Sequence, residues 1–232
     1  MGLSHSPRIV TDGLVFCVDA ANPRSYPGAG TTWTDLTSAS VTGTLLNGPT
    51  FDSDNAGSIV FDGSDDYVNF GTPTIITEFP LTITSFIKRS SSDTRDVIFG
   101  NYYAVGTNRS FQFEIDNNNV LQGICSSDGT FQASNEVNGS TTINTDEVYH
   151  ASCVMESGEA RVYLNGVLDG TDSSWASELN TPVARYLIGA EDTNSAGAHY
   201  FAGNIYSIQV YNRALTTAEI RRNYNATRWR FQ

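Results

Sequence analysis

The stretch Tyr200–Ile220, YFAGNIYSIQVYNRALTTAEI, decides the fold, because it places a strand, a turn and a short helix next to one another in the chain. Apolar Ile205, Ile208 and Val210 stand among polar and aromatic neighbours, a pattern typical of a strand with one or both faces buried. Thr216 precedes a helical pattern, and the glutamate three residues later can complete a capping box. The segment predicts a buried strand followed by a helix.

Turn dipeptides recur along the whole chain and predict hairpins throughout. Asn-Gly and Asp-Gly pairs favour positive φ and tight reversals between strands. These pairs begin at Asp12, Asn47, Asp62, Asp128, Asn138, Asn165 and Asp169. The clearest hairpin joins Arg161–Leu164 to a strand that starts at Val167. Since only residues 217 to about 225 have a helical pattern, we expect an all-β protein with two antiparallel sheets and one short C-terminal helix.

The length of the chain sets the expected domain organisation. At 232 residues it suits one undivided β-sandwich. We assign residues 13–227 to this domain, 1–12 to an N-terminal arm and 228–232 to a C-terminal tail. Both ends lie outside the periodic core, so each is either an arm that docks onto a neighbouring subunit or an ordinary terminal tail.

Charge and hydropathy argue against several classes of function. The formal net charge of -12 argues against non-specific nucleic-acid binding, because a polyanionic surface repels phosphates. The opening MGLSHSPRIVTDG contains no apolar run of the kind found in secretory signals, so we expect a protein made in a cytoplasm. No stretch approaches the ~20 apolar residues of a membrane-spanning helix, so we expect no membrane insertion.

The cysteines predict buried thiols rather than a disulfide framework. Cys17, Cys125 and Cys153 lie in strand-like runs, and Cys153 shares a period-2 pattern with Tyr149 and Ala151. Their odd number and the absence of CxxC spacing argue against a framework of bridges or a zinc site. A single bridge between two of them stays open at this point.

Three further segments carry a family resemblance. They are LVFCVDAAN at 14–22, SIVFDGSDDYVNF at 58–70 and ARVYLNGVLDGT at 160–171. Together with Tyr200–Ile220 they resemble the laminin-G-like, concanavalin A-like lectin/glucanase family over roughly 13–227. The resemblance implies a two-sheet antiparallel jelly-roll sandwich. That fold serves enzymes, lectins and structural proteins alike, so it does not decide the activity.

The opening HSPRIVTDGLVFCVDAANPRSYPGAGTTWTDL, at residues 5–36, is similar to virion structural proteins of tailed phages, notably marine ones. This resemblance implies a non-enzymatic virion surface protein, either a capsid decoration or a fibre component, assembled in the host cytoplasm. Its partners would be other virion proteins and host glycans, and by analogy we expect a homo-oligomer. A glycan-binding receptor-recognition lectin and a glycoside hydrolase are the alternatives. Many relatives have Asp where this chain has Tyr206, so no role of that acid transfers.

Hydrolase chemistry has one candidate motif. FQFEIDNNN places Glu114 and Asp116 on the polar face of a predicted strand. Glycosidases need two carboxylates, about 5–5.5 Å apart for retention or about 6.5–9.5 Å apart for inversion. The resemblance to the glucanase motif ends there, because Asn118 or Asn119 stands where a second catalytic Glu is needed, and an amide cannot protonate a leaving group. We therefore expect a solvated strand face and no enzyme. Likewise, we expect His150 to be a satisfied structural histidine.

The segment FDGSDDYVNF concentrates hard oxygen ligands. Asp62, Asp65 and Asp66 fall within five residues, and calcium takes about six to eight oxygen ligands. Ordinary turn chemistry is the alternative explanation, since Asp-Gly-Ser-Asp favours a reversal between strands. No cofactor is required by this interpretation, and calcium is the ion that the turn would take. Glu191 and Asp192 are the distant residues that we expect to contribute.

Sugar recognition needs an exposed aromatic ring with polar groups beside it. Tyr102 and Tyr103 follow Gly100 at a predicted strand end, and Trp175 lies in a polar loop that we expect to leave it partly exposed. Each ring can instead fill the edge of the core. We predict Tyr102, Tyr103 and Trp175 as the ligand-binding residues.

Overall fold

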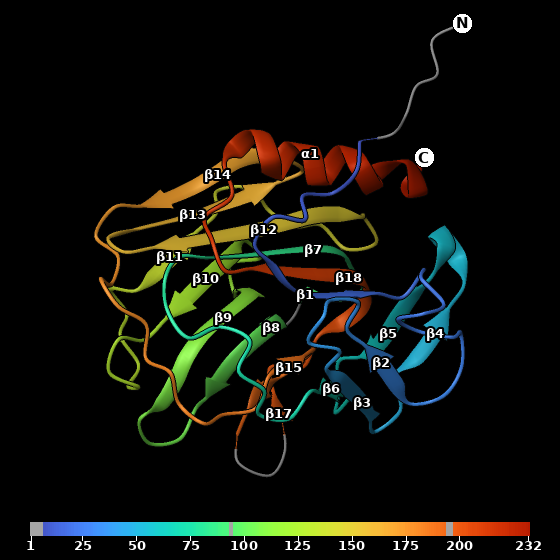
Figure 1. Ribbon diagram of the computed structural model, residues 1–232, viewed down its shortest axis with the longest axis horizontal. Helices are drawn as coiled ribbons and strands as arrows, with labels where there is room; N and C mark the ends of the chain where they lie inside the picture. The colour runs from blue at the N-terminus through green and yellow to red at the C-terminus, as the bar shows by residue number, and fades with distance from the viewer. Residues whose placement is uncertain (1–6, 93–94, 194–196) are drawn as a thin grey trace, which may run out of the picture.

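The computed structural model describes residues 7–92, 95–193 and 197–232, and it shows two sheets packed face to face with a helix across one outer face (Figure 1). The first sheet, in spatial order, contains β14 (Val167–Asp172), β13 (Glu159–Leu164), β12 (Tyr149–Glu156), β7 (Leu81–Arg89), β18 (Ala202–Tyr211), β5 (Ser58–Asp62) and β4 (Thr50–Asp52), with β1 (Leu14–Asp19) also paired to β18. The predicted all-β jelly-roll sandwich is confirmed.

The second sheet is the larger of the two. In spatial order it contains β11 (Glu136–Asn138), β10 (Leu121–Cys125), β9 (Asn108–Ile115), β8 (Asp96–Tyr103), β15 (Leu187–Ile188), β6 (Tyr67–Asn69), β3 (Thr42–Leu46) and β2 (Thr32–Thr34). The short strands β16 (Glu191–Asp192) and β17 (Gly197–Ala198) form a hairpin attached to β8 by a parallel bridge between Asp192 and Tyr103.

The core lies between the two sheets, as alternation of side chains requires. On β9, Phe111, Phe113 and Ile115 point inward, and each is fully buried. From β7 of the facing sheet, Ile83 and Ile87 join the same apolar cluster. The residues between them, Gln112 and Glu114 on β9, point to the outer face of their sheet.

The predicted hairpin and the predicted buried thiols are confirmed. Leu164 pairs with Val167 across a tight turn in which Asn165 and Gly166 have φ of 51° and 78°, as the Asn-Gly signal requires. All three cysteines are free and buried, so the question of a single bridge is settled. Among the described residues, no helix is long and apolar enough to cross a membrane.

The C-terminal helix α1 (Thr217–Thr227) begins at the predicted capping box. Thr216 Oγ1 accepts from Glu219 N at 3.3 Å, and Thr216 N donates to Glu219 Oε2 at 2.9 Å. Ile220 is fully buried against Tyr163 and Tyr211, which fixes the helix on the outer face of the first sheet. The helix runs slightly past the predicted end and continues into the 3₁₀ turn η2 (Arg228–Phe231).

The C-terminal segment 228–232, predicted to lie outside the core, packs onto the same molecule. Arg230 donates to the carbonyls of Asn55 and Gly57 at 3.1 and 3.0 Å, and its Nη1 lies 3.1 Å from Asp19 Oδ1. Asn55 belongs to the short 3₁₀ turn η1 (Asp54–Ala56). The segment is therefore held by three contacts with residues far away in the sequence.

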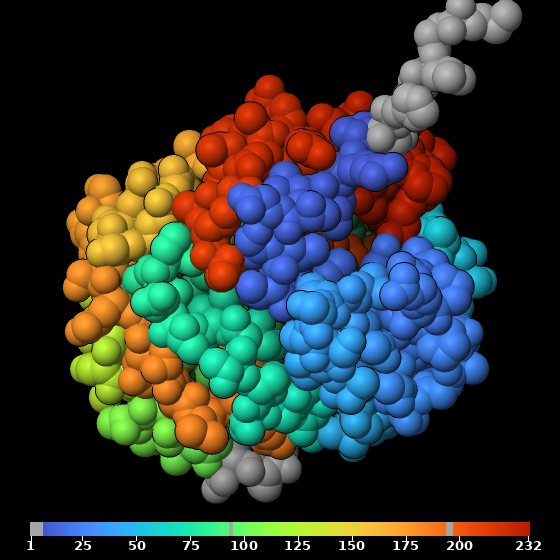
Figure 2. Space-filling model, in the orientation of Figure 1, coloured from blue at the N-terminus to red at the C-terminus, as the bar shows by residue number. Residues whose placement is uncertain are grey.

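The described part of the N-terminal arm also packs on the sandwich; residues 1–6 of the arm lie outside the described residues. Val10 is buried, and its N–H donates to Asn223 Oδ1 of α1 at 2.8 Å. Arg222 donates to the carbonyl of Arg8 at 2.7 Å. The space-filling view shows residues from both ends of the chain meeting on one side of the molecule (Figure 2).

Candidate functional site

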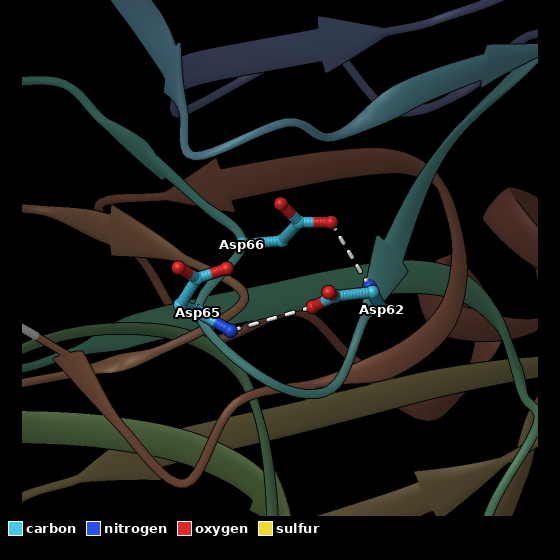
Figure 3. A group of neighbouring side chains, drawn as sticks. All are labelled: Asp62, Asp65 and Asp66. Carbon is cyan, nitrogen blue, oxygen red and sulfur yellow. Dashed lines mark hydrogen bonds between the residues drawn. The ribbon is translucent and has the colours of Figure 1, made fainter.

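The turn between β5 and β6 gathers three carboxylates (Figure 3). One oxygen from each of Asp62, Asp65 and Asp66 lies within 4.8 Å of the others. The backbone produces this geometry: Asp62 Oδ1 accepts from the N–H groups of Ser64 and Asp65 at 2.7 and 3.3 Å, and Asp66 Oδ2 accepts from Asp62 N at 3.0 Å. The structure thus brings the three predicted residues together.

The electrostatics of this turn suit a cation. Burial raises the pKa of Asp66, which is 4% exposed, and the charges of Asp62 and Asp65 raise it further. Backbone hydrogen bonds, chiefly from Ser64, lower the pKa of Asp62. A divalent cation relieves such crowding of like charges, and the three carboxylates would supply about half of the oxygens that calcium takes.

The second loop at this turn is not the one expected. Asn47 donates from Nδ2 to the carbonyl of Asp65 at 2.7 Å, so the turn after β3 borders the carboxylates. Glu191 and Asp192, the expected distant contributors, are engaged elsewhere. Arg95 Nη2 lies 3.0 Å from Glu191 Oε2, and Arg185 Nε donates to Asp192 Oδ2 at 2.9 Å. Sequence reasoning missed Asn47, although its Asn-Gly turn was visible.

Two of the three predicted aromatic residues are buried. Tyr102 is 4% exposed and lies beneath the guanidinium of Arg109, whose carbon is 5.6 Å from the ring centroid. Trp175 is 5% exposed and belongs to the core, so its expected exposure was wrong. The loop folds back because Gly158 N donates to the carbonyl of Ala176 at 3.1 Å, beside the indole in sequence. Neither ring presents a free face to a ligand.

Tyr103 is the predicted aromatic residue that remains half-buried at the surface. It lines a shallow hollow of about 180 Å³ together with Val183, Ala184, Arg185 and Asp192. Arg185 and Asp192 form a two-point pair, with Nε donating to Oδ2 at 2.9 Å and Nη2 donating to Oδ1. Such a pair holds both side chains in a fixed plane. The hollow offers a ring beside oriented polar groups, which is the chemistry that binds a sugar.

A buried polar cluster occupies the outer face of the second sheet. Glu114 is fully buried, and its Oε1 lies 2.8 Å from Arg95 Nε. Gln112 also donates to Glu114, and the same Arg95 reaches Glu191 of β16. The expected solvated strand face was therefore wrong, because Arg95 and β16 cover this part of the sheet. The sequence carried no signal for this contact.

The electrostatics of the cluster are unusual. Burial raises the pKa of Glu114 to about 7, although the charge and hydrogen bonds of Arg95 oppose the shift. Asp116 has a different environment: its Oδ1 accepts from Asn118 N and Val120 N at 2.9 and 3.0 Å. Its carboxylate therefore closes its own turn, and the two acids of the motif have separate partners.

His150 is completely buried between aromatic rings. Its ring centroid lies 4.7 Å from that of Phe86 and 5.8 Å from that of Tyr224. Burial lowers its pKa to about 3, so the imidazole is neutral. The expectation of a satisfied histidine was wrong in one respect: neither ring nitrogen has a hydrogen-bond partner in the described part of the chain.

The fold and these sites define a jelly-roll sandwich with polar groups at its rim and on its outer faces. The chain belongs to the concanavalin A-like lectin/glucanases superfamily, whose family model matches residues 62–221, more than half of the chain. No curated protein matches the chain by sequence.

Solved structures with the same fold include proteins of different activities. Trypanosoma rangeli sialidase in complex with sialic acid is 16% identical, with a TM-score of 0.66 over 96% of this chain and 36% of its own, so the chain spans about a third of that sialidase. Domain 4 of AbnA, a GH43 extracellular arabinanase from Geobacillus stearothermophilus, in complex with arabinotriose, is 15% identical, with a TM-score of 0.63 over 94% of this chain and 98% of its own.

A third structure is the binding domain of Paraclostridial Mosquitocidal Protein 1. It is 13% identical, with a TM-score of 0.69 over 92% of this chain and 52% of its own. At identities this low, the likeness of all three structures shows the fold alone.

Proposed function

We propose that the protein is a non-enzymatic carbohydrate-binding module. The observation that carries this proposal is the hollow in which the half-buried ring of Tyr103 lies beside the fixed pair of Arg185 and Asp192. A sugar face packs on such a ring while its hydroxyls exchange hydrogen bonds with the polar groups. The arabinanase domain that carries arabinotriose supports the proposal, because this chain covers almost all of that domain.

The environment of the acidic residues supports binding rather than hydrolysis. Glu114 is enclosed by Arg95 and Gln112, and Asp116 accepts hydrogen bonds from its own turn. A retaining glycosidase needs a pair of carboxylates that face one substrate. The amide of Asn118, one of the two residues at which the motif could place its second carboxylate, donates to Asp116. The proposed module therefore binds sugar without cleaving it.

More specifically, we propose that the protein lies on the surface of a virion, as a capsid decoration or a fibre component, and contacts other virion proteins and host glycans. This proposal rests on the resemblance of residues 5–36 to virion structural proteins of tailed phages. Labelling purified particles with an antibody against the protein tests this location. Its absence from particles would leave a binding module and remove the virion role.

Glycan binding is tested with an array, followed by titration calorimetry on the ligands that bind. We expect Tyr103→Ala to weaken binding about tenfold, since loss of ring stacking of about 1.4 kcal/mol corresponds to that factor. Tyr103→Phe keeps the ring and should bind like the wild type. Phe131→Ala is the matched control, because it removes another exposed aromatic ring, 54% exposed.

Two outcomes contradict the proposal. Binding that is equal in the Tyr103→Ala and Phe131→Ala variants would remove the hollow as the site. Turnover of a polysaccharide that disappears in Glu114→Gln would show that the protein is an enzyme.

A further inference from the structure

A larger pocket lies on the first sheet, where the C-terminal segment crosses its outer face. Its volume is about 370 Å³, within the range of about 300–1,000 Å³ that small-ligand sites occupy. Its lining comes from four separate parts of the chain and includes Phe86, Glu147, Asn165, Tyr224, Arg228 and Phe231. None of these residues was predicted as functional from the sequence.

Aromatic rings form one wall of this C-terminal pocket. Phe86 and Phe231 stack with centroids 5.0 Å apart at 25°, and Phe86 and Tyr224 lie 6.3 Å apart at 18°. His150 lies against Phe86 on the neighbouring strand, completely buried and without a partner for either ring nitrogen among the described residues. His150 is not among the residues that line the pocket, so it supports the ring of Phe86 from behind and does not meet a ligand.

The rim of the pocket carries both donors and acceptors with unused capacity. Glu147 is exposed, and its Oε2 accepts a hydrogen bond from Tyr149, while its Oε1 has no partner among the residues that the structure describes. Asn165 Oδ1 accepts from His150 N at 2.9 Å, while its Nδ2 has no partner in the described part of the chain. The guanidinium carbon of Arg228 lies 5.4 Å from the centroid of the Tyr224 ring, and Arg228 makes no ion pair with any residue that the structure describes. A ligand therefore meets one acceptor and two donors.

Contacts outside the pocket hold its aromatic wall in place. Phe231 is held because the neighbouring Arg230 is bound to Asn55, Gly57 and Asp19. Phe231 also packs edge-on against Tyr206, with centroids 4.8 Å apart. Rigid walls of this kind reduce the ordering cost of binding.

We propose that this pocket binds a neutral saccharide unit, as a second glycan site on the sheet opposite the Tyr103 hollow. An anion would meet the carboxylate of Glu147, and a cation would meet the guanidinium of Arg228. A sugar hydroxyl both donates and accepts, so a neutral sugar satisfies both groups while its C–H face packs on the rings. The inference rests on the proposed carbohydrate-binding function and adds a site to it.

The test uses the full chain with arabinotriose, lactose and maltotriose, measured by saturation-transfer NMR and titration calorimetry. We expect Arg228→Ala to weaken binding at the C-terminal pocket about tenfold, the factor set by about 1.4 kcal/mol. Arg221→Ala is the matched control, since it removes an exposed arginine from the same helix outside the pocket. Phe231→Tyr keeps the aromatic wall, so this variant should bind like the wild type.

The variants separate this inference from the proposed function. Binding that survives Tyr103→Ala but weakens in Arg228→Ala supports the C-terminal pocket. Binding that is lost in Tyr103→Ala and unchanged in Arg228→Ala overturns the second site and keeps the proposed function. If none of the three sugars, nor any sugar on the array, binds the wild type, both proposals fail.

Discussion

Replacing Glu114 by Gln should change how the stability of the protein depends on pH. The substitution keeps the shape of the side chain and removes its titration. Arg95 still has Glu191 as a partner, with Nη2 and Oε2 3.0 Å apart, so no guanidinium is left without a carboxylate. The variant therefore isolates the proton on one buried acid.

The sign follows from the direction of the pKa shift. Burial raises the pKa of Glu114 from 4.5 to about 7, so within this window the folded protein keeps a proton that the unfolded chain has lost. The free energy of unfolding must then fall as pH rises, by about 1.4 kcal/mol per pH unit. Over the window between the two pKa values, the loss amounts to ~3 kcal/mol.

Urea unfolding between pH 4.5 and 8 measures this effect. We expect the stability of Glu114→Gln relative to the wild type to increase by ~3 kcal/mol across this range, because every other titrating group cancels in the difference. Glu178→Gln, which removes an exposed carboxylate, is the control and should run parallel to the wild type. Parallel profiles for Glu114→Gln would refute the account of Glu114 as a desolvated acid.

Three further predictions concern other parts of the fold. Arg230→Ala should lower the free energy of unfolding by about 3 kcal/mol, since it removes two charge-assisted hydrogen bonds and an ion pair. Arg228→Ala is the control and should lower it by less than ~1 kcal/mol. Thermal unfolding measures both variants, and equal effects would contradict the docked C-terminal segment. We propose that calcium binds the acidic turn. Calcium should then raise the melting temperature of the wild type and leave that of Asp65→Asn unchanged. If millimolar calcium does not raise the melting temperature of the wild type, the turn is not a calcium site. Burial raises the pKa of Cys17 and of Cys125 to about 12, so a thiol reagent should label three cysteines only after unfolding, and rapid labelling of the native protein would contradict their burial.

The features that the sequence predicted correctly are local ones. The capping box links Thr216 to a residue three positions away, and the hairpin at Asn165 depends on two adjacent residues with positive φ. The acidic turn is likewise local, since Asp62 and Asp66 are joined through backbone groups within five residues. Interactions between residues this close in the chain can be predicted from the amino-acid sequence.

The features that the sequence missed depend on distant contacts. The polar pattern around Glu114 predicted a solvated face, but Arg95 and Glu191 approach from other segments and bury it. Trp175 is a second case of the same kind, because its polar neighbours in sequence suggested exposure, whereas the loop folds inward and buries the ring. Patterning tells which face of a strand is polar, and it does not tell what covers that face.

The sequence by itself determined the two-sheet sandwich, the C-terminal helix and the acidic turn, because alternation, turn residues and caps act over a few neighbouring positions. Only the tertiary structure decided which side chains line the two hollows. Tyr103 of β8 lines one hollow with Arg185, from the loop before β15, and Asp192 of β16, and Phe86 stacks on Phe231 from the far end of the chain. Both sites arise from the closure of the sandwich, which brings together residues that are far apart in sequence.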